Sequence, residues 1–547
     1  MFKFADVLGR AMCVGIIIGF SAVSSAQTVT PGQVQDTLRK TPELKSPAAA
    51  PVEQKRNTHL GAGADGPKVT VTQFTFSGNT VYSNDALADL VKDYVNRPIT
   101  LSDIYDAADV VSNFYLKNGY GLASVNVPAQ KISGGTVKLE VIEGRLSRIT
   151  VEGNKRHKTK NILGYLGEVK QGEVYRGGNL QESMRKINEL PGLKAKAIVA
   201  PGDQYGTSDI VIKTDETLLN GSLTFDNYGR TQIDEYRTTG QIQINNPFTI
   251  EDQINLLALH SVGSHLRYYF GSYSLPINYF GTRVQAEYGH ADFIVKGTPV
   301  SGHSDNSRLS LIQPIIRSAV NTLTFTTGVT YNTGTTNFDP IGKLSGSSIT
   351  LFDVGGSYIH LYDSQAVTQV STNISSTFGS FDTTTPPPGT TTHDDQALKL
   401  EVDALHLQPL PASFNLLAHV NAVYSPDQLA DSQKFNVGGP QNVRGYPALE
   451  IRRDRGYFGS LTLSRPFQSG PLVISPRTFV DSGKVYNVDP LPGGIDSESL
   501  SSIGIGSDFA YEGASFKIDW SVPITSHVAS DNHNTGRVFG ALSYTFN

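Results

Sequence analysis

Cysteine is almost missing from this chain. Its 547 residues include one cysteine, Cys13, which lies in a segment that we expect to be removed. A mature chain without cysteine has no disulfide, no thiolate nucleophile and no cysteine-based metal site. Charge is also sparse, since charged residues make up 17% of the chain whereas soluble domains carry about 25%. The net charge of −5 provides no basic surface for nucleic acid, so we expect no nucleic-acid partner.

The N-terminus has the three parts of a secretory signal. Lys3 and Arg10 supply positive charge, residues 11–20 are apolar, and residues 24–26 are small, as a cleavage site requires. The apolar part is too short to cross a bilayer as a helix, and no later apolar run reaches about 18 residues. We therefore expect residues 1–26 to be a signal peptide. An exported chain of this composition is either a periplasmic protein or an outer-membrane barrel.

Motifs of nucleotide-driven proteins and of common hydrolases are missing as well. The sequence has no G-x-x-x-x-G-K-[ST] loop, no H-E-x-x-H pair and no G-x-S-x-G turn. Its 12 histidines are scattered, and His290 and His303 lie in or beside a predicted loop, where solvated side chains are expected. We expect no enzyme activity, no metal site and no cofactor.

Between the signal and the first folded unit, the sequence is poor in large apolar residues. Residues 27–44 include one short stretch capable of forming a helix, Gly32–Lys40. Residues 45–68 are rich in alanine, glycine and proline, which bury too little surface to offset the entropy of ordering them. We expect residues 45–68 to be a flexible linker.

Two copies of an α+β pattern follow, at residues 69–144 and 145–216. Each copy has the order β-α-α-β-β over about 70–75 residues, a length typical of a duplicated domain rather than of a solenoid repeat. The dipeptides Gly78-Asn79 and Gly153-Asn154 mark the same turn after the first strand of each copy. In the first copy, the helix predicted at 101–117 has one apolar stripe with the 3–4 spacing that faces a core.

From 217 to 547, period-2 alternation replaces helical periodicity. In the last segment Val538, Leu542 and Tyr544 share one face, and Ser543 lies on the other. The segments are about 9–12 residues long, enough to cross the hydrocarbon at a tilt. A soluble sandwich also alternates, but aromatic residues lie near the segment ends, as in the interfacial girdles of membrane barrels. Because lipid tolerates no open sheet edge, the segments must close into a barrel.

The fold class predicted here is a membrane all-β barrel of about sixteen antiparallel strands, preceded by two α+β domains. The candidate strands lie near 221–228, 236–245, 252–261, 265–276, 281–290, 307–314, 321–331, 348–361, 365–377, 396–406, 412–424, 455–467, 471–485, 499–510, 513–523 and 536–547. The long polar gaps at 291–306, 378–395 and 425–454 are predicted to be extracellular loops, because barrels of this type have long outer loops and short periplasmic turns.

Two segments do not fit a plain barrel. Val443-Arg444-Gly445-Tyr446 lies in the long gap at 425–454, and Phe479-x-Asp481-x-Gly483 lies at the end of the thirteenth strand. Asp481 should face the lumen, because the lipid face penalises charge. If the loop folds inward, Arg444 can reach Asp481 and form a charge-assisted fork. Taken singly, the two strings could also be an exposed loop and a turn.

These residues resemble a known family, the TpsB-type transporters of two-partner secretion, also called haemolysin secretion/activation proteins. They belong to the superfamily of outer-membrane barrels that carry POTRA domains. Residues 443–446 resemble the motif of the family's inward-folded sixth extracellular loop, and residues 479–483 resemble its partner on the barrel wall. Phe76-Ser-Gly-Asn-Thr80 and Val141-Ile-Glu-Gly-Arg145 resemble the first POTRA domain. Residues 27–44 resemble the family's plug helix, which sits in the pore.

The resemblance implies a transporter in the bacterial outer membrane, with its POTRA domains in the periplasm. Such a transporter recognises an unfolded exoprotein partner of the TpsA type and secretes it through the barrel. Outer-membrane lipids and the barrel assembly machinery are further implied partners. The candidate substrate-binding residues of the first POTRA domain are Tyr120, Gln130, Glu143 and Arg145, although Glu143 could equally belong to a strand-ending turn.

Two other functions stay open from the residues alone. An outer-membrane insertase or assembly factor would share both motifs, although two POTRA domains rather than three or five favour secretion. A passive porin would need neither periplasmic domains nor an inward loop.

Overall fold

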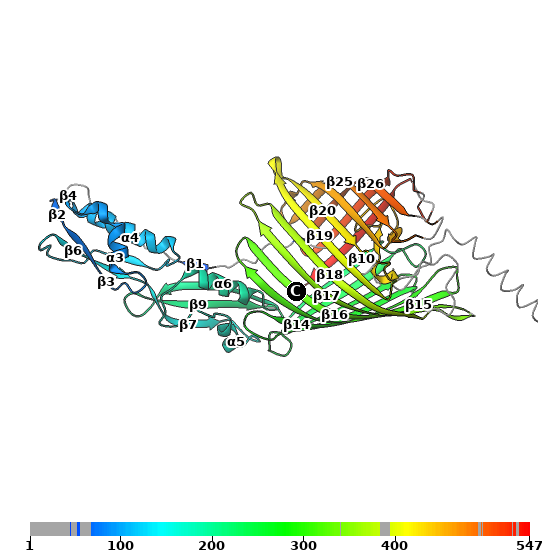
Figure 1. The fold of residues 1–547 in the computed structure, drawn as a ribbon, viewed down its shortest axis with the longest axis horizontal. Helices are drawn as coiled ribbons and strands as arrows, with labels where there is room; N and C mark the ends of the chain where they lie inside the picture. Colours follow the sequence, from blue (N-terminus) through cyan, green and yellow to red (C-terminus); the bar gives the residue numbers. More distant parts are fainter. Residues whose placement is uncertain are drawn as a thin grey trace, which may run out of the picture.

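Two small α+β units extend in a row from one end of a large β-barrel (Figure 1). The computed structural model describes residues 44, 52–54, 67–339, 341–382, 394–490, 494, 496–527, 529–531 and 535–546. The expected signal peptide and all but the last residue of the possible plug helix at 27–44 lie outside the described residues. No helix within the described part of the chain is long and apolar enough to cross a membrane.

The barrel is closed and antiparallel throughout, and its first strand pairs with its last. Its strands are β10 (Leu219–Asp226), β11 (Arg237–Asn245), β12 (Gln253–Ser261), β13 (Leu266–Pro276), β14 (Arg283–Ile294), β15 (Val300–Arg317), β16 (Asn321–Phe338), β17 (Gly342–Leu361), β18 (Val367–Asp382), β19 (Gln396–Leu410), β20 (Phe414–Tyr424), β23 (Arg455–Ser464), β24 (Phe467–Ser469), β25 (Leu472–Tyr486), β26 (Ser497–Tyr511), β27 (Ala514–Pro523) and β28 (Arg537–Phe546). Because β23 and β24 both pair with β25, they form one interrupted strand, and the barrel has the predicted sixteen strands.

The two faces of the barrel wall differ in the way that a membrane requires. On the outside, Val538, Leu542 and Tyr544 are 49%, 54% and 55% exposed, an apolar surface of the kind that faces lipid. On the inside, polar side chains such as Asp481 and Asp519 are buried. The alternation predicted for the last strand is therefore present in the structure.

Strands β15, β16, β17 and β18 are longer than predicted, with 18, 18, 20 and 16 residues. The predicted loop at 291–306 is wrong in most of its length, because β14 continues to Ile294 and β15 begins at Val300. Beyond the hydrocarbon both faces of a strand meet water, so polar residues continue the backbone ladder without alternation. His290 and His303 consequently lie in β14 and β15 rather than in a loop.

The first α+β unit is a three-stranded sheet packed against two helices. Its elements are β2 (Val69–Val71), β3 (Gln73–Ser77), α3 (Asn84–Leu90), the 3-10 turn η1 (Lys92–Tyr94), β4 (Arg97–Ile99), α4 (Leu101–Lys117), β5 (Ser124–Asn126) and β6 (Thr136–Ile142), with the main sheet in the order β3-β6-β5. Helix α4 begins with a capping box between Thr100 and Asp103, and it buries Ile104, Val111 and Tyr115 in the core. The apolar stripe predicted for residues 101–117 therefore faces the sheet.

The second unit repeats this plan. It consists of β7 (Arg145–Glu152), α5 (Thr159–Gly164), α6 (Gly177–Asn188), β8 (Leu193–Pro201) and β9 (Thr207–Glu216). A short strand, β1 (Val52–Gln54), completes the sheet in the order β1-β8-β9-β7. The expectation of a flexible linker at 45–68 is wrong for these three residues. They pair in parallel with β8. Without them, the edge of β8 would leave its backbone groups unpaired, which is why an extended segment can bind there.

A carboxylate fixes the same turn in both units, and in the first unit it is buried. Glu143 accepts hydrogen bonds from the backbone N–H groups of Thr80 (2.6 Å) and Val81 (2.8 Å). Glu216 accepts them from Lys155 and Arg156, both at 2.8 Å. The turns begin at Gly78 and Gly153, whose φ angles of +86° and +87° suit glycine. The duplication seen in the sequence thus extends to a shared structural device.

Replacing either carboxylate by glutamine should loosen its turn. Burial alone would raise the pKa of Glu143 and of Glu216, but the hydrogen bonds outweigh it and lower both pKa values. The ionised carboxylates therefore stabilise the turns at pH values above the ordinary pKa of glutamate. This stabilisation is lost as the pH falls through the lowered pKa values. For Glu143→Gln or Glu216→Gln we expect a loss of about 1–3 kcal/mol. Hydrogen exchange in the intact protein measures it, with the barrel amides as the internal reference. Unchanged protection in the turns would contradict the assignment.

The second unit contacts the barrel turns at the end from which the two units extend (Figure 1). The rings of Tyr165, which follows α5 directly, and Tyr279 pack edge to face with centroids 5.1 Å apart. Glu189 forms an ion pair of 2.8 Å with Arg317 at the end of β15. His157 contacts Glu251, and both side chains are buried. Because the chain enters β10 from this unit, these turns lie on the same side of the barrel as the two units, and the long connections lie at the other end.

Candidate functional site

The sixth outer connection, residues 425–454, folds into the barrel. It contains a 3-10 turn, η3 (Asp431–Gln433), and a small hairpin of β21 (Phe435–Val437) and β22 (Ile451–Arg453). We call this connection loop six. Its apolar side chains join wall residues in one buried cluster, which comprises Ala397, Val423, Leu429, Phe435, Val437, Val443, Tyr446, Ile451, Phe458, Val485, Leu500 and Ala529. Val443 and Tyr446, the ends of the predicted motif, are both fully buried.

Arg444 at the tip of loop six and Asp481 on β25 form the predicted fork. The guanidinium Nε donates to Asp481 Oδ2 and Nη2 donates to Oδ1, each at 2.8 Å. The backbone N–H of Arg444 donates to Oδ2 as well, at 3.2 Å. Arg444 is 8% exposed and Asp481 is fully buried. A bidentate pair in a low-dielectric setting is strong and directional, so it fixes the position of the loop tip.

The other motif residues shape the seat of this pair. The Arg444 guanidinium lies over the Phe479 ring, with Cζ 3.3 Å from the centroid. A side chain at Gly445 would place its Cβ 2.8 Å from Ser502 Cβ and 3.0 Å from a backbone nitrogen. A Cβ at Gly483 would lie 2.8 Å from Val437 of loop six. Both glycines therefore permit close approach between the loop and the wall.

The sequence did not identify several residues that complete the site. Ser460 donates to Asp481 Oδ1 at 2.7 Å, and Arg444 Nη2 donates to Thr462 Oγ1 at 3.3 Å. Asp519 lies 4.0 Å from Arg444 and is held at 2.8 Å by Arg477. A Cβ at Gly504 would lie 2.4 Å from the Phe479 ring, so this glycine makes room for the ring. The run Ile503-Gly-Ile-Gly506 was the available signal, since small residues alternating inward leave space on the lumen face.

The site holds a loop in place and has no feature of a metal centre. Within the residues that the structure describes, no group of three or more histidine, cysteine, aspartate or glutamate side chains could hold a metal ion. The buried charges of the Arg444–Asp481 fork and of its neighbours Arg477 and Asp519 are paired with one another, as charges in such a setting must be.

The comparisons with known proteins decide the family. Residues 206–509, more than half of the chain, match the family model described as haemolysin secretion/activation protein ShlB/FhaC/HecB. Residues 69–144 match the model of the ShlB-type POTRA domain. The chain belongs to this family. The predicted family, the barrel with periplasmic POTRA domains and the outer-membrane location are thereby confirmed, and the protein is a secretion transporter.

Relatives of this ShlB-type transporter align over nearly its full length. The outer membrane transporter CdiB of Dickeya dadantii (strain 3937) is 26% identical over 89% of this chain and 90% of its own. The heme/hemopexin transporter protein HuxB of Haemophilus influenzae (strain 86-028NP) is 25% identical over 99% of both chains. Among solved structures, CdiB from Escherichia coli superposes with a TM-score of 0.72 at 22% identity, covering 95% of this chain and 100% of that one.

In this ShlB-type transporter, three of the four candidate substrate-binding residues gather where the two units meet. Arg145 donates to Thr80 of the first unit (2.8 Å) and to the Gly172 carbonyl of the second (3.1 Å). Glu143 lies 3.8 Å from Arg145 and is buried. The Tyr120 ring lies under the Arg176 guanidinium, 5.9 Å from its Cζ. Substrate binding by these residues stays a prediction.

Gln130 lies apart from the other three. Its side chain donates to the carbonyl of Lys138 (2.7 Å) and accepts from the same residue's N–H (2.8 Å), so it extends the hydrogen bonding of β6. The predicted role of Glu143 meets a competing explanation, because its oxygens already serve the turn at Thr80 and Val81 and the Tyr115 hydroxyl at 2.9 Å.

Proposed function

We propose that this transporter receives one secreted partner of the TpsA type in unfolded form and conducts it through the barrel. The POTRA units capture the partner in the periplasm, and loop six closes the path at rest. The arginine–aspartate fork inside the lumen carries this proposal, because a passive pore has no use for a charged lock between a loop and its own wall. Both partners of the fork are buried, so the locked loop is a defined state rather than a solvated one.

The POTRA units suit the capture of an extended chain. Strand addition to a sheet edge provides backbone hydrogen bonds without demanding a particular sequence. Among the described residues, β5 lies at the end of the first unit's main sheet, whereas the β8 edge of the second unit is covered by β1. The first unit therefore offers an open edge, while β1 occupies the β8 edge of the second unit.

Transport proceeds without catalysis in this proposal. No nucleotide-binding loop occurs in the sequence. The driving force is the folding of the partner at the cell surface, which disfavours its return. Conformational exchange of loop six opens the path, and partner binding shifts this exchange towards the open state.

Two further partners follow from the barrel itself. Its exposed apolar outer face contacts outer-membrane lipids. A closed barrel of this kind is inserted by the barrel assembly machinery of the cell.

The neighbouring reading frame provides the first test of the partner. A large secreted protein with an N-terminal β-helical secretion domain, expressed together with the transporter, should appear in the medium. Its retention in the periplasm in the presence of a folded transporter would refute the pairing.

Deleting residues 27–44 tests the predicted plug. If this segment rests in the lumen, its removal should raise the conductance of the protein in planar lipid bilayers. Deleting residues 55–66 from the linker is the control, because it shortens the same region and leaves the segment itself intact. Equal conductance of the deletion variant and the unaltered protein would remove the plug from the mechanism.

A further inference from the structure

A second buried carboxylate of loop six lies near the outer rim of the barrel. Glu450 is 1% exposed and precedes β22. Its two oxygens accept three hydrogen bonds from the connection between β27 and β28. Ser530 donates its N–H and its hydroxyl, both at 2.7 Å, and His527 Nε2 lies 3.0 Å from Oε1. These donors fall on one short segment, 77 and 80 residues away in sequence from Glu450.

Apolar contacts accompany these hydrogen bonds. Ala529, between the two donor residues, is 1% exposed and belongs to the buried cluster of loop six. The rings of His527 and Tyr446 lie 5.9 Å apart, and the Tyr446 hydroxyl bonds to Thr525. Tyr446 is also the last residue of the motif that holds Arg444. His527, Ala529 and Ser530 therefore contact loop six around both Glu450 and Tyr446.

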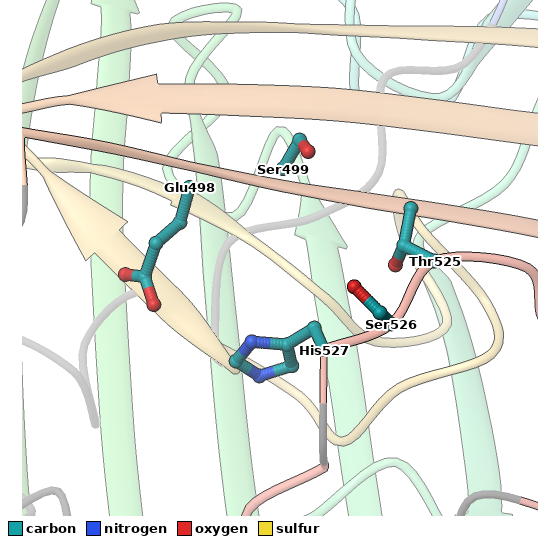
Figure 2. A pocket seen from close by; sticks show the side chains of 5 residues that line it. All are labelled: Glu498, Ser499, Thr525, Ser526 and His527. Atoms are coloured by element: carbon teal, nitrogen blue, oxygen red, sulfur yellow. The ribbon is translucent and has the colours of Figure 1, made fainter.

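Next to this contact lies an open cleft of about 460 Å³. Figure 2 shows Glu498 and Ser499 on one side of it and Thr525, Ser526 and His527 on the other. His527 lines this cleft and its side chain is 24% exposed, whereas that of Glu450 is 1% exposed. A histidine placed in this way can exchange protons while its partner remains buried.

We propose that Glu450 is a second positioning residue for loop six, which it ties to His527 and Ser530 independently of the fork at Arg444. The inference rests on the proposed gating by loop six. The two contacts hold different parts of the loop. Arg444 secures its tip on β25, and Glu450 secures its return towards β23. Opening the path by moving loop six then requires both to break.

The Glu450 contact includes the imidazole of His527, so it depends on pH near neutrality. The fork between Arg444 and Asp481 contains no imidazole. The hydrogen bond that His527 donates to Glu450 raises the pKa of His527, burial opposes this, and the charge of Glu450 raises it further. Glu498 on β26 also raises this pKa, and Arg453 on β22 lowers it. Because the pKa is higher in the closed state, the ion pair stabilises that state below the ordinary histidine pKa. The stabilisation is lost as the pH rises through the raised pKa.

Conductance of the whole protein in planar bilayers, without any partner, tests this proposal. The open fraction of the unaltered protein should rise between about pH 6 and about pH 9, which bracket the ordinary histidine pKa of about 6.5. Glu450→Ala should raise the open fraction about tenfold near pH 6, which corresponds to about 1.4 kcal/mol, and should flatten the pH profile. His527→Gln should flatten the profile and keep a hydrogen-bond donor in place. Ser526→Ala, in the same connection between β27 and β28, is the control and should behave like the unaltered protein.

Two results would overturn the proposal. One is an unaltered pH profile in both Glu450→Ala and His527→Gln, each checked for heat-modifiable folding. The other is the absence of any further opening when Glu450→Ala is added to Asp481→Ala, since independent contacts must have additive free energies. Neither of these conductance measurements depends on secretion. A failure of the proposed partner or of capture by the POTRA units would therefore be seen separately, in the secretion assay.

Discussion

Asp481→Ala is expected to lower secretion by at least about tenfold while the barrel still assembles, because breaking a buried ion pair costs about 3–5 kcal/mol. The substitution leaves the Arg444 guanidinium buried over the Phe479 ring. Among the described residues, its recorded polar neighbours are then Ser460, Thr462 and the more distant Asp519. Loop six then loses its fixed position, and the path that it normally closes and opens is no longer defined. Secreted partner in the medium and heat-modifiable barrel in the membrane are the two measurements.

A second lumen pair provides a matched control. Arg308 on β15 forks onto Asp353 on β17, with Nη2 2.8 Å from Oδ2, and has no contact with loop six among the described residues. Asp353→Ala removes the same chemistry from the wall and should leave secretion near its normal level. Arg444→Lys should give an intermediate loss, since lysine keeps the charge but not the bidentate geometry. Normal secretion by Asp481→Ala would show that the fork is not the lock.

Alternation made the barrel predictable, and its limits explain the errors. Where a strand crosses lipid, one face must be apolar, so the sixteen crossings are visible in the sequence. Outside the lipid this constraint ends. The stretch Ser301–Asn306 contains only serine, glycine, histidine, aspartate and asparagine, yet it pairs fully with β14 and β16. Strand β1 was invisible for a related reason, because three residues of a linker pair through their backbone alone.

The lock could be predicted in part because two of its residues lie in recognisable strings. Their neighbours required the register between strands, which the sequence does not state. Register places Ser460 opposite Asp481 and Thr462 opposite Phe479, and it places Gly504 opposite Phe479 on the other side. Glu450 belongs with these residues, since its donors come from a connection that alternation does not describe.

Deleting residues 69–144 is expected to abolish secretion and to leave a folded barrel. The barrel closes through its own strands, and the second unit has its own core and its own contacts with the barrel turns. The first unit lies farthest from the barrel (Figure 1), and its sheet provides an open edge for an extended partner. Retention of the partner in the periplasm, beside a heat-modifiable barrel, is the expected measurement. Secretion at the normal rate would mean that capture occurs elsewhere.

Point variants separate capture from mere stability of the unit. Tyr120 packs against the ring of Tyr115 and faces Arg176. Tyr105 on α4 is 39% exposed and takes part in neither of these contacts. Tyr120→Ala should reduce secretion and partner binding together, and Tyr105→Ala should change neither. Hydrogen exchange decides whether the first unit is still folded in each variant. Equal losses of secretion and partner binding in the two variants would contradict the prediction. The effect would then not be specific to the predicted residue Tyr120.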